Sequence, residues 1–429
     1  MAIANKLTSL PRYLYSNTAS NLNLLCTIEQ NIIDTIQGLP EIKQAYETST
    51  AKSSITTLQR GCQVMENVMK GSKEHVSSLK FLADLQNYHG LYGDSSNTIR
   101  VIRSLTQDNE GKALLLAQAK SEFNHGNFNE SLRLGKEMQH VSSEHLDVGC
   151  SLTAIALSKL MIYLCNVHEM DELDTKEETI IIQDFNDAVE SLQNIEQDDF
   201  SRQGILASSG ASHNLYIASY ALSNLYTNQN ISIPDHITAT TDISAQLSNT
   251  IKDLTTNSFN DTIHPYYHYL HQSTLASLYC TQSHDKLFHT KSITQEELQT
   301  TSKACQEALH ICEALKKENI EDPLIFSRSL FLVAQCFAKA NSAITSEGLF
   351  NSCIDLLKNQ PNSPYRDLVL RDVYSGNAEL YRNWERRERD AEKFDILAKD
   401  LEGGMVDEWK FKDGILSGLW FFTLSDFYL

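Results

Sequence analysis

The chain contains few of the residues that most often interrupt helices. Its 429 residues include only seven prolines and 17 glycines. Because these two residues are the strongest helix breakers, their scarcity, beside long runs of Leu, Ala, Glu, Gln and Lys, predicts an all-α protein. Hydrophobic residues make up 41% of the chain and charged residues only 21%. This composition gives enough apolar material for a core, which excludes a wholly disordered chain.

Positive charge is also scarce. The formal net charge is −19, which opposes binding to phosphate backbones and to anionic membrane surfaces. The main basic cluster lies at residues 382–389 and alternates with acidic residues, so it predicts a solvated, salt-bridged helix face. We therefore expect no nucleic-acid partner.

None of the nine cysteines belongs to a Cys-x-x-Cys pair. An odd number of cysteines, scattered through apolar helical stretches, fits buried thiols in a reducing compartment better than a disulfide framework. This pattern favours a cytoplasmic protein.

Residues 1–28 leave a second location open. They contain Lys6, Arg12, several serines and threonines, and no acidic residue. That is the composition of a weak mitochondrial or plastid targeting segment. The alternative interpretation is a first helix that is broken near Pro11.

Long apolar runs are missing. No run of about 18 uncharged apolar residues occurs, and this is the length that a membrane-spanning helix needs. The nearest candidate, Ile415 to Leu429, is short and contains Asp426. A transmembrane helix is therefore not predicted.

Two sequence windows, 33 residues apart, carry the same pattern of large and small side chains. The matched positions are Leu82, Leu85, Gln86, Gly93, Asp94, Thr98, Ile102 and Leu105 in the first window, and Leu115, Gln118, Ala119, Gly126, Asn127, Ser131, Gly135 and Met138 in the second. A helix-turn-helix unit of this length, with small residues at fixed places and a Gly-Asp or Gly-Asn turn, resembles the tetratricopeptide repeat.

A later unit that begins near Ser327 shows the same resemblance. Signature positions 4, 7, 8, 11, 20, 24 and 27 of the repeat are occupied by Leu330, Val333, Ala334, Phe337, Ser346, Phe350 and Cys353. Ala334 and Ser346 are small because the two helices of the hairpin are expected to cross there. The tryptophan at position 4 and the proline at position 32 are missing, so a related class of helical hairpin remains open for the middle of the chain.

Apolar periodicity near 3.6 residues places further helices along the chain. The expected ranges are 19–37, 51–70, 73–91, 95–106, 111–124, 127–139, 144–168, 178–195, 199–227, 237–256, 264–282, 295–317, 365–386 and 388–401. They divide the chain into leading helices at 1–70, two compact repeats at 71–140, longer hairpins at 141–320, two repeats at 321–404 and an aromatic segment at 405–429. The resemblance implies an α-solenoid of about seven to nine stacked antiparallel hairpins.

Such a solenoid implies a non-enzymatic scaffold, adaptor or subunit of a multiprotein complex that binds a partner segment in its groove. Dinucleotide-binding glycine motifs, P-loops and nucleophile elbows are absent from the sequence, so we expect neither catalysis nor a cofactor. The partner and the oligomeric state are not specified by this pattern.

Three histidines provide the competing hypothesis. His264, His268 and His271 have the spacing of one helix face, where they could bind a metal ion in a metalloprotein or hydrolase. Pro265 stands where a zinc-protease helix would carry its glutamate base. We therefore favour a contact surface for a partner, formed by Tyr266, Tyr267, His268 and His271, with no bound metal.

The last segment supplies a second candidate contact surface. Trp409, Trp420 and Phe421 belong to an unusually aromatic stretch, although terminal repeats normally expose a polar face. Three interpretations remain: a helix that folds back on the solenoid, a docking element for a partner, and an interfacial membrane anchor.

Overall fold

The described part of the protein is entirely helical in its regular secondary structure. The computed structural model describes residues 51–404, together with 416, 418 and 419. Positions 89, 107, 168–172, 194–200, 239–242, 257–264, 290–292, 318–321, 361 and 385 within that range are excepted. The helix expected at 19–37 lies outside the described residues.

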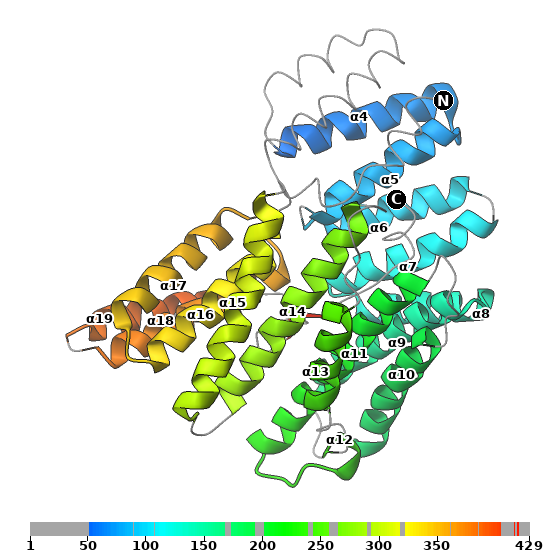
Figure 1. Cartoon of the computed structure of the whole chain (residues 1–429). Helices are drawn as coiled ribbons and strands as arrows, with labels where there is room; N and C mark the ends of the chain where they lie inside the picture. Colours follow the sequence, from blue (N-terminus) through cyan, green and yellow to red (C-terminus); the bar gives the residue numbers. More distant parts are fainter. Residues whose placement is uncertain are drawn as a thin grey trace.

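After α4 (Ala51–Met69), the helices of the described residues pair into seven hairpins (Figure 1). The pairs are α5 (Lys73–Tyr88) with α6 (Tyr92–Leu105), α7 (Asp108–Asn124) with α8 (Phe128–Val141), α9 (His145–Asn166) with α10 (Thr175–Gln193), α11 (Ser201–Asn228) with α13 (Ile243–Thr256), α14 (Pro265–His289) with α15 (Gln295–Lys317), α16 (Pro323–Lys339) with α17 (Ala343–Lys358), and α18 (Pro364–Arg382) with α19 (Glu388–Gly404). The short α12 (Asp235–Thr238) lies between α11 and α13.

The hairpins stack in chain order. Each second helix contacts its own first helix and the first helix of the next hairpin. The first helices α7, α9, α11, α14, α16 and α18 also contact one another in sequence. This arrangement is an all-α solenoid of stacked helical hairpins, as the sequence predicted.

Local sequence signals explain where the later helices begin. Asp322 and Ser363 are N-caps whose side chains accept hydrogen bonds from the backbone N–H groups of Ile325 and Arg366, each at 3.1 Å. A proline occupies the first turn after each cap, where its missing N–H costs nothing. These caps fix the entry of the chain into α16 and α18.

Three hairpins turn in the same way. Gly90, Gly126 and Asn341 all have positive φ, at 73°, 89° and 59°, and each lies two positions before the second helix of its hairpin. In each turn the next backbone N–H bonds to a carbonyl five residues earlier, at 2.8–2.9 Å. This is the Schellman termination, which satisfies the last carbonyls of the first helix.

Two of these hairpins cross at small side chains. The Ser95 hydroxyl donates to the carbonyl of Ala83 at 2.8 Å, and the Ser346 hydroxyl donates to that of Ala334 at 2.9 Å. All four residues are buried. An alanine and a hydrogen-bonded serine let two backbones approach closely without leaving a polar group unsatisfied.

The sequence alignment of the first two units is corrected by this geometry. The turn between α5 and α6 uses Gly90, whereas Gly93 and Asp94 lie in the first turn of α6. Helix α6 begins at Tyr92 and α8 at Phe128, 36 positions later. The predicted 33-residue register therefore placed the first turn three residues too late.

A buried carboxylate connects three helices in the middle of the stack. Glu178 of α10 is fully buried and accepts hydrogen bonds from the hydroxyls of Tyr163 (2.6 Å, α9) and Tyr226 (2.7 Å, α11). Burial, followed by donation to Glu178, raises the pKa of both tyrosines. The two phenols thus remain neutral donors and offset the cost of burying the charge.

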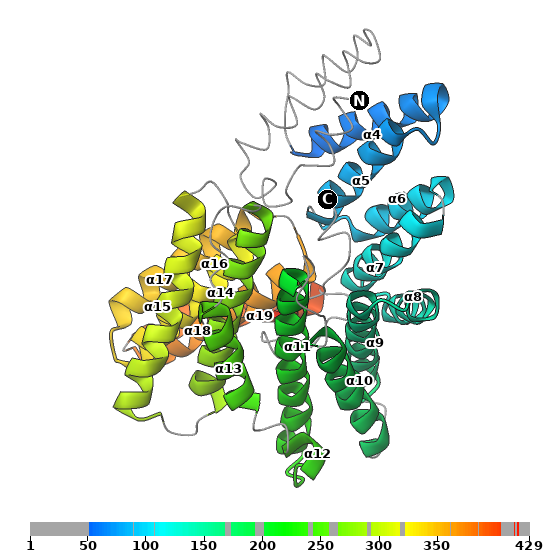
Figure 2. The same cartoon turned by 45° about the vertical axis from the view of Figure 1, so that its right-hand side comes forward.

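The stack curves until α18 meets the first two hairpins (Figure 2). The Tyr365 hydroxyl donates to Asn124 Oδ1 at 2.8 Å, across 241 positions of sequence. A Cβ placed on Gly90 would lie 2.3 Å from the Asn362 carbonyl oxygen, and Ser363 is a hydrogen-bonding partner of Tyr92. We call these six residues the closure contact.

Helix α9 has the length and apolarity of a membrane span, and it is the one described helix that does. However, 78% of its most apolar window is buried inside the protein, where it contacts α8, α10 and α11. Its composition is therefore explained by a core position. The earlier candidate at 415–429 lies almost wholly outside the described residues.

Replacement of Tyr226 by Phe is expected to lower the free energy of unfolding by about 1–3 kcal/mol, because one oxygen of buried Glu178 loses its donor. Chemical denaturation at neutral pH measures this change. Tyr279→Phe is the control, since it removes the hydroxyl of a partly buried tyrosine on α14, while the donors to Glu178 are Tyr163 and Tyr226. Equal losses in the two variants would show that the hydrogen bond to Glu178 adds nothing to the free energy of unfolding beyond the loss of a tyrosine hydroxyl.

The same contact predicts a loss of stability at alkaline pH. Unfolded tyrosines ionise near pH 10, whereas Tyr163 and Tyr226 have raised pKa values in the folded protein. The unfolded chain therefore releases protons first, and the free energy of unfolding falls as the pH rises above about 10. Tyr226→Phe should make that fall shallower in denaturation series from pH 8 to 11.

Gly90→Ala should open the closure contact, whereas Gly71→Ala should not. Both glycines have nearly equal φ, 73° and 76°, but a Cβ on Gly71 meets nothing within 4 Å. Left-handed backbone costs an alanine roughly 1–2 kcal/mol at either site. Small-angle X-ray scattering should show a larger radius of gyration for Gly90→Ala alone; identical scattering from both variants would contradict the role of this contact.

Candidate functional site

Successive first helices form one continuous surface, made by α7, α9, α11, α14, α16 and α18, which we call the first-helix face. Its helices follow one another across both views, from α18 and α16 on the left through α14 and α11 to α9 and α7 on the right (Figures 1 and 2). Because six successive hairpins each contribute one helix, the surface extends along the stack from α7 to α18.

A row of aromatic rings crosses this face from α11 to α16. Tyr220 meets His284 edge-on with ring centroids 6.0 Å apart, and His284 lies 4.5 Å from Phe288. Phe288 then stacks on Phe331 at 6.1 Å with an angle of 7° between the planes. Phe288 is 43% exposed, whereas the other three are buried. The row therefore exposes the Phe288 ring to solvent, while the buried rings of His284 and Phe331 pack against it and restrict its orientation.

A buried polar cluster joins the same three helices. Thr281 Oγ1 lies 2.7 Å from His213 Nε2 and accepts a 3.1 Å hydrogen bond from Arg328 Nη2. Each of the three residues is at most 6% exposed. Burial and, second, the nearby Arg328 lower the pKa of His213 to about 3. The imidazole is therefore neutral at physiological pH, and the guanidinium supplies the charge of the cluster.

Residues near the end of the sequence lie against this cluster. An ideal Cβ on Gly418 would lie 2.5 Å from Arg328 Nη1 and 3.2 Å from its Cζ. Leu416 is 1% exposed and Leu419 is partly buried, and both pack with the core of α7, α9 and α11. These residues fit the interpretation that the aromatic segment folds back on the solenoid.

Most of the contact residues predicted from sequence are not placed in detail. Tyr266, Tyr267 and His268 lie in the first turn of α14, and their side chains are outside the described set. Trp409, Trp420 and Phe421 also lie outside the described residues. Their proposed role stays a prediction.

His271 is an exception, and its place in a contact surface is corrected. It is 2% exposed. Its Nε2–H donates to the Leu254 carbonyl of α13 at 2.8 Å, and the Gln272 amide donates to its Nδ1 at 3.2 Å. Since both ring nitrogens are engaged within the protein, His271 joins α13 to α14 and faces no partner.

Of the three histidines in the metal hypothesis, His271 is the one whose side chain is described. His264 is outside the described residues, and the position of the His268 side chain is not described. Within the described ranges, no group of three His, Cys, Asp or Glu side chains is arranged to hold a metal ion. The bonded state of His271 leaves it no lone pair for a ligand role.

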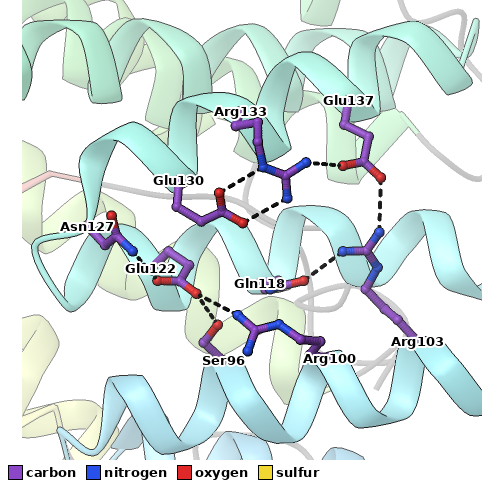
Figure 3. Close-up of polar contacts among 9 residues, drawn as sticks. All are labelled: Ser96, Arg100, Arg103, Gln118, Glu122, Asn127, Glu130, Arg133 and Glu137. Carbon is purple, nitrogen blue, oxygen red and sulfur yellow. Dashed lines mark hydrogen bonds and ion pairs between the residues drawn. The ribbon is translucent and has the colours of Figure 1, made fainter.

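A charged network on α6, α7 and α8 serves the packing of these helices (Figure 3). Arg103 donates to Gln118 at 2.7 Å and to Glu137 at 3.0 Å, and Arg133 donates to Glu137 at 2.8 Å. Hydrogen bonds from Arg133 also lower the pKa of Glu130. Because these charges are paired within the molecule, the network holds neighbouring hairpins in register.

Sequence reasoning missed the cluster of His213, Thr281 and Arg328. These residues stand alone in apolar helices, and nothing local distinguishes them from surface residues. The available signal was Arg328, which comes two positions before the apolar run from Leu330 to Val333. A charge beside the core side of a helix requires a buried partner.

The chain was compared with protein-family models, curated proteins and solved structures. No protein-family model matches the chain, and no curated protein matches it. One solved structure, titled "Circular tandem repeat protein with novel repeat topology and enhanced subunit contact surfaces", aligns over 93% of this chain and 95% of its own. The identity is 10% and the TM-score is 0.26.

His271→Leu is expected to destabilise the protein by about 1–3 kcal/mol, because the buried Leu254 carbonyl loses its donor. Thermal or chemical denaturation measures this effect. His310→Leu is the matched control, since His310 is exposed on α15. Loss of stoichiometric bound zinc from His271→Leu, with stability unchanged, would instead identify His271 as a ligand.

Proposed function

We propose that this chain is a non-enzymatic interaction scaffold of the tetratricopeptide-like class, acting as an adaptor or as a subunit of a multiprotein complex. The observation that carries the proposal is the continuous first-helix face with its exposed aromatic residue, Phe288. An extended surface of this kind holds a peptide or helix through many small contacts. Its expected location is the cytoplasm.

The repeat-like hairpins support the assignment to this class. Three of them share the same left-handed turn, and two of these share a serine-to-alanine hydrogen bond at the helix crossing. A stack built this way repeats the same local packing along its length and leaves an extended surface for a partner.

Phe288 is the residue on which we place the first contact. Aromatic side chains contribute large contact area with few rotatable bonds, and they are enriched among residues that dominate binding energy. Its neighbours His284 and Phe331 hold the ring in one orientation. A partner would therefore meet a preformed aromatic site.

Phe288→Glu should release the partner without unfolding the protein. The test is quantitative affinity purification of the full chain, comparing wild type, Phe288→Glu and the control Ile344→Glu. Ile344 is 78% exposed on α17, a second helix, so the control adds the same charge outside the first-helix face. We expect a near-stoichiometric protein in the wild-type and Ile344→Glu samples, reduced at least roughly tenfold with Phe288→Glu.

Unfolding temperatures of the three proteins accompany this comparison. If both variants retain the partner equally, or both lose it, the first-helix face is not the binding surface. A recurrent absence of any partner from all three samples would remove the scaffold assignment.

A further inference from the structure

Leu416, Gly418 and Leu419 follow the last of the described hairpins in sequence. The last hairpin is completed by α19, which ends at Gly404, yet Leu416, Gly418 and Leu419 pack against helices from distant parts of the stack. The solenoid helices are thus already paired without them. The three residues therefore lie against the solenoid as a bound peptide would, although they belong to the same chain.

Two leucines anchor this segment. Leu416 is 1% exposed, and Leu419 packs against the same core, which includes residues of α9 and α11 and Leu368 of α18. Full burial of one leucine side chain contributes about 1.5–3 kcal/mol. The apolar side chains therefore supply most of the attraction between the segment and the solenoid.

Gly418 sets a strict requirement between the leucines. A Cβ at this position would overlap the Arg328 guanidinium, with distances of 2.5, 3.2 and 3.3 Å to its Nη1, Cζ and Nη2 atoms. Contacts below 3.0 Å require something to move. Residue 418 must consequently be glycine while Arg328 stays in place.

Arg328 is held in place by the polar cluster. It is 5% exposed, and its Nη2 donates to Thr281 Oγ1, which in turn contacts His213. Moving the guanidinium would break its buried hydrogen bond to Thr281, and an unsatisfied buried group costs more than an exposed one. By holding the Arg328 guanidinium in place, the cluster limits the size of the side chain at residue 418.

We propose that this surface recognises a protein segment of the pattern apolar-x-Gly-apolar, and that Leu416, Gly418 and Leu419 occupy it as an internal ligand. A partner carrying the same pattern binds by displacing the chain's own segment. The proposal rests on the scaffold function proposed above and specifies the chemistry of the partner. The tether gives the internal ligand a high effective concentration, so it weakens the apparent affinity of any competitor.

The test uses two labelled peptides and the full-length chain. One peptide has the sequence of residues 411–424 with lysines appended for solubility, and its matched control carries Val in place of the glycine that corresponds to Gly418. Fluorescence anisotropy measures binding to wild type and to Gly418→Val, whose own segment no longer fits. We expect the glycine peptide to bind Gly418→Val at least roughly tenfold more tightly than wild type, and the valine peptide to bind neither.

Equal affinity of the glycine peptide for the two chains would overturn internal competition. Equal binding of the two peptides would overturn the glycine requirement.

Hydrogen exchange on the wild-type chain tests displacement without any variant. Saturating glycine peptide should accelerate amide exchange at residues 416–419 at least severalfold, and the valine peptide should not. Unchanged exchange under saturation would show that the segment is a fixed part of the core, which contradicts the proposal.

The two proposals fail separately. If the peptides do not discriminate but Phe288→Glu loses a partner, the scaffold function stands and the internal ligand is removed. If the peptides discriminate but purification recovers no partner, the recognition site stands and the scaffold function is removed.

Discussion

The close crossing of helices within each hairpin is the constraint on which the architecture depends. Ser95 on Ala83 and Ser346 on Ala334 keep the crossing narrow while the serine hydroxyl bonds to the opposite backbone. A narrow crossing lets each hairpin bury its apolar face against the next one. Along the stack that results, Tyr365 at the beginning of α18 comes within hydrogen-bonding distance of Asn124 at the end of α7.

Most of the helices could be predicted from sequence because their apolar period and their breakers are local. Pro265, Pro323 and Pro364 each stand at the beginning of a helix, and such signals need no knowledge of the fold. The first turn was misplaced because Gly90 and Gly93 are both plausible turn glycines. Only the backbone distinguishes them: Gly90 has a φ of 73°, while Gly93 is helical.

The candidate surface was harder to predict, since it is made of residues that are distant in sequence. His271 has the same spacing to its neighbours whether its face is exposed or buried, and the position of Leu254 decides between the two. Arg328 and Gly418 meet only because the chain returns across the stack. No local pattern carries that information, whereas the aromatic character of residues 405–429 was visible at once.

The closure contact has a consequence for how the protein unfolds. A linear array of repeats frays from its ends, because a terminal hairpin has one neighbour and unfolds at little cost. Here the hairpins of α5 and α7 are tied to α18 through Gly90, Asn124 and Tyr365. Unfolding that begins at the hairpins of α5 and α7, or at the hairpin of α18, must first break this contact. The contact therefore makes the hairpins between them unfold together, as a single cooperative unit.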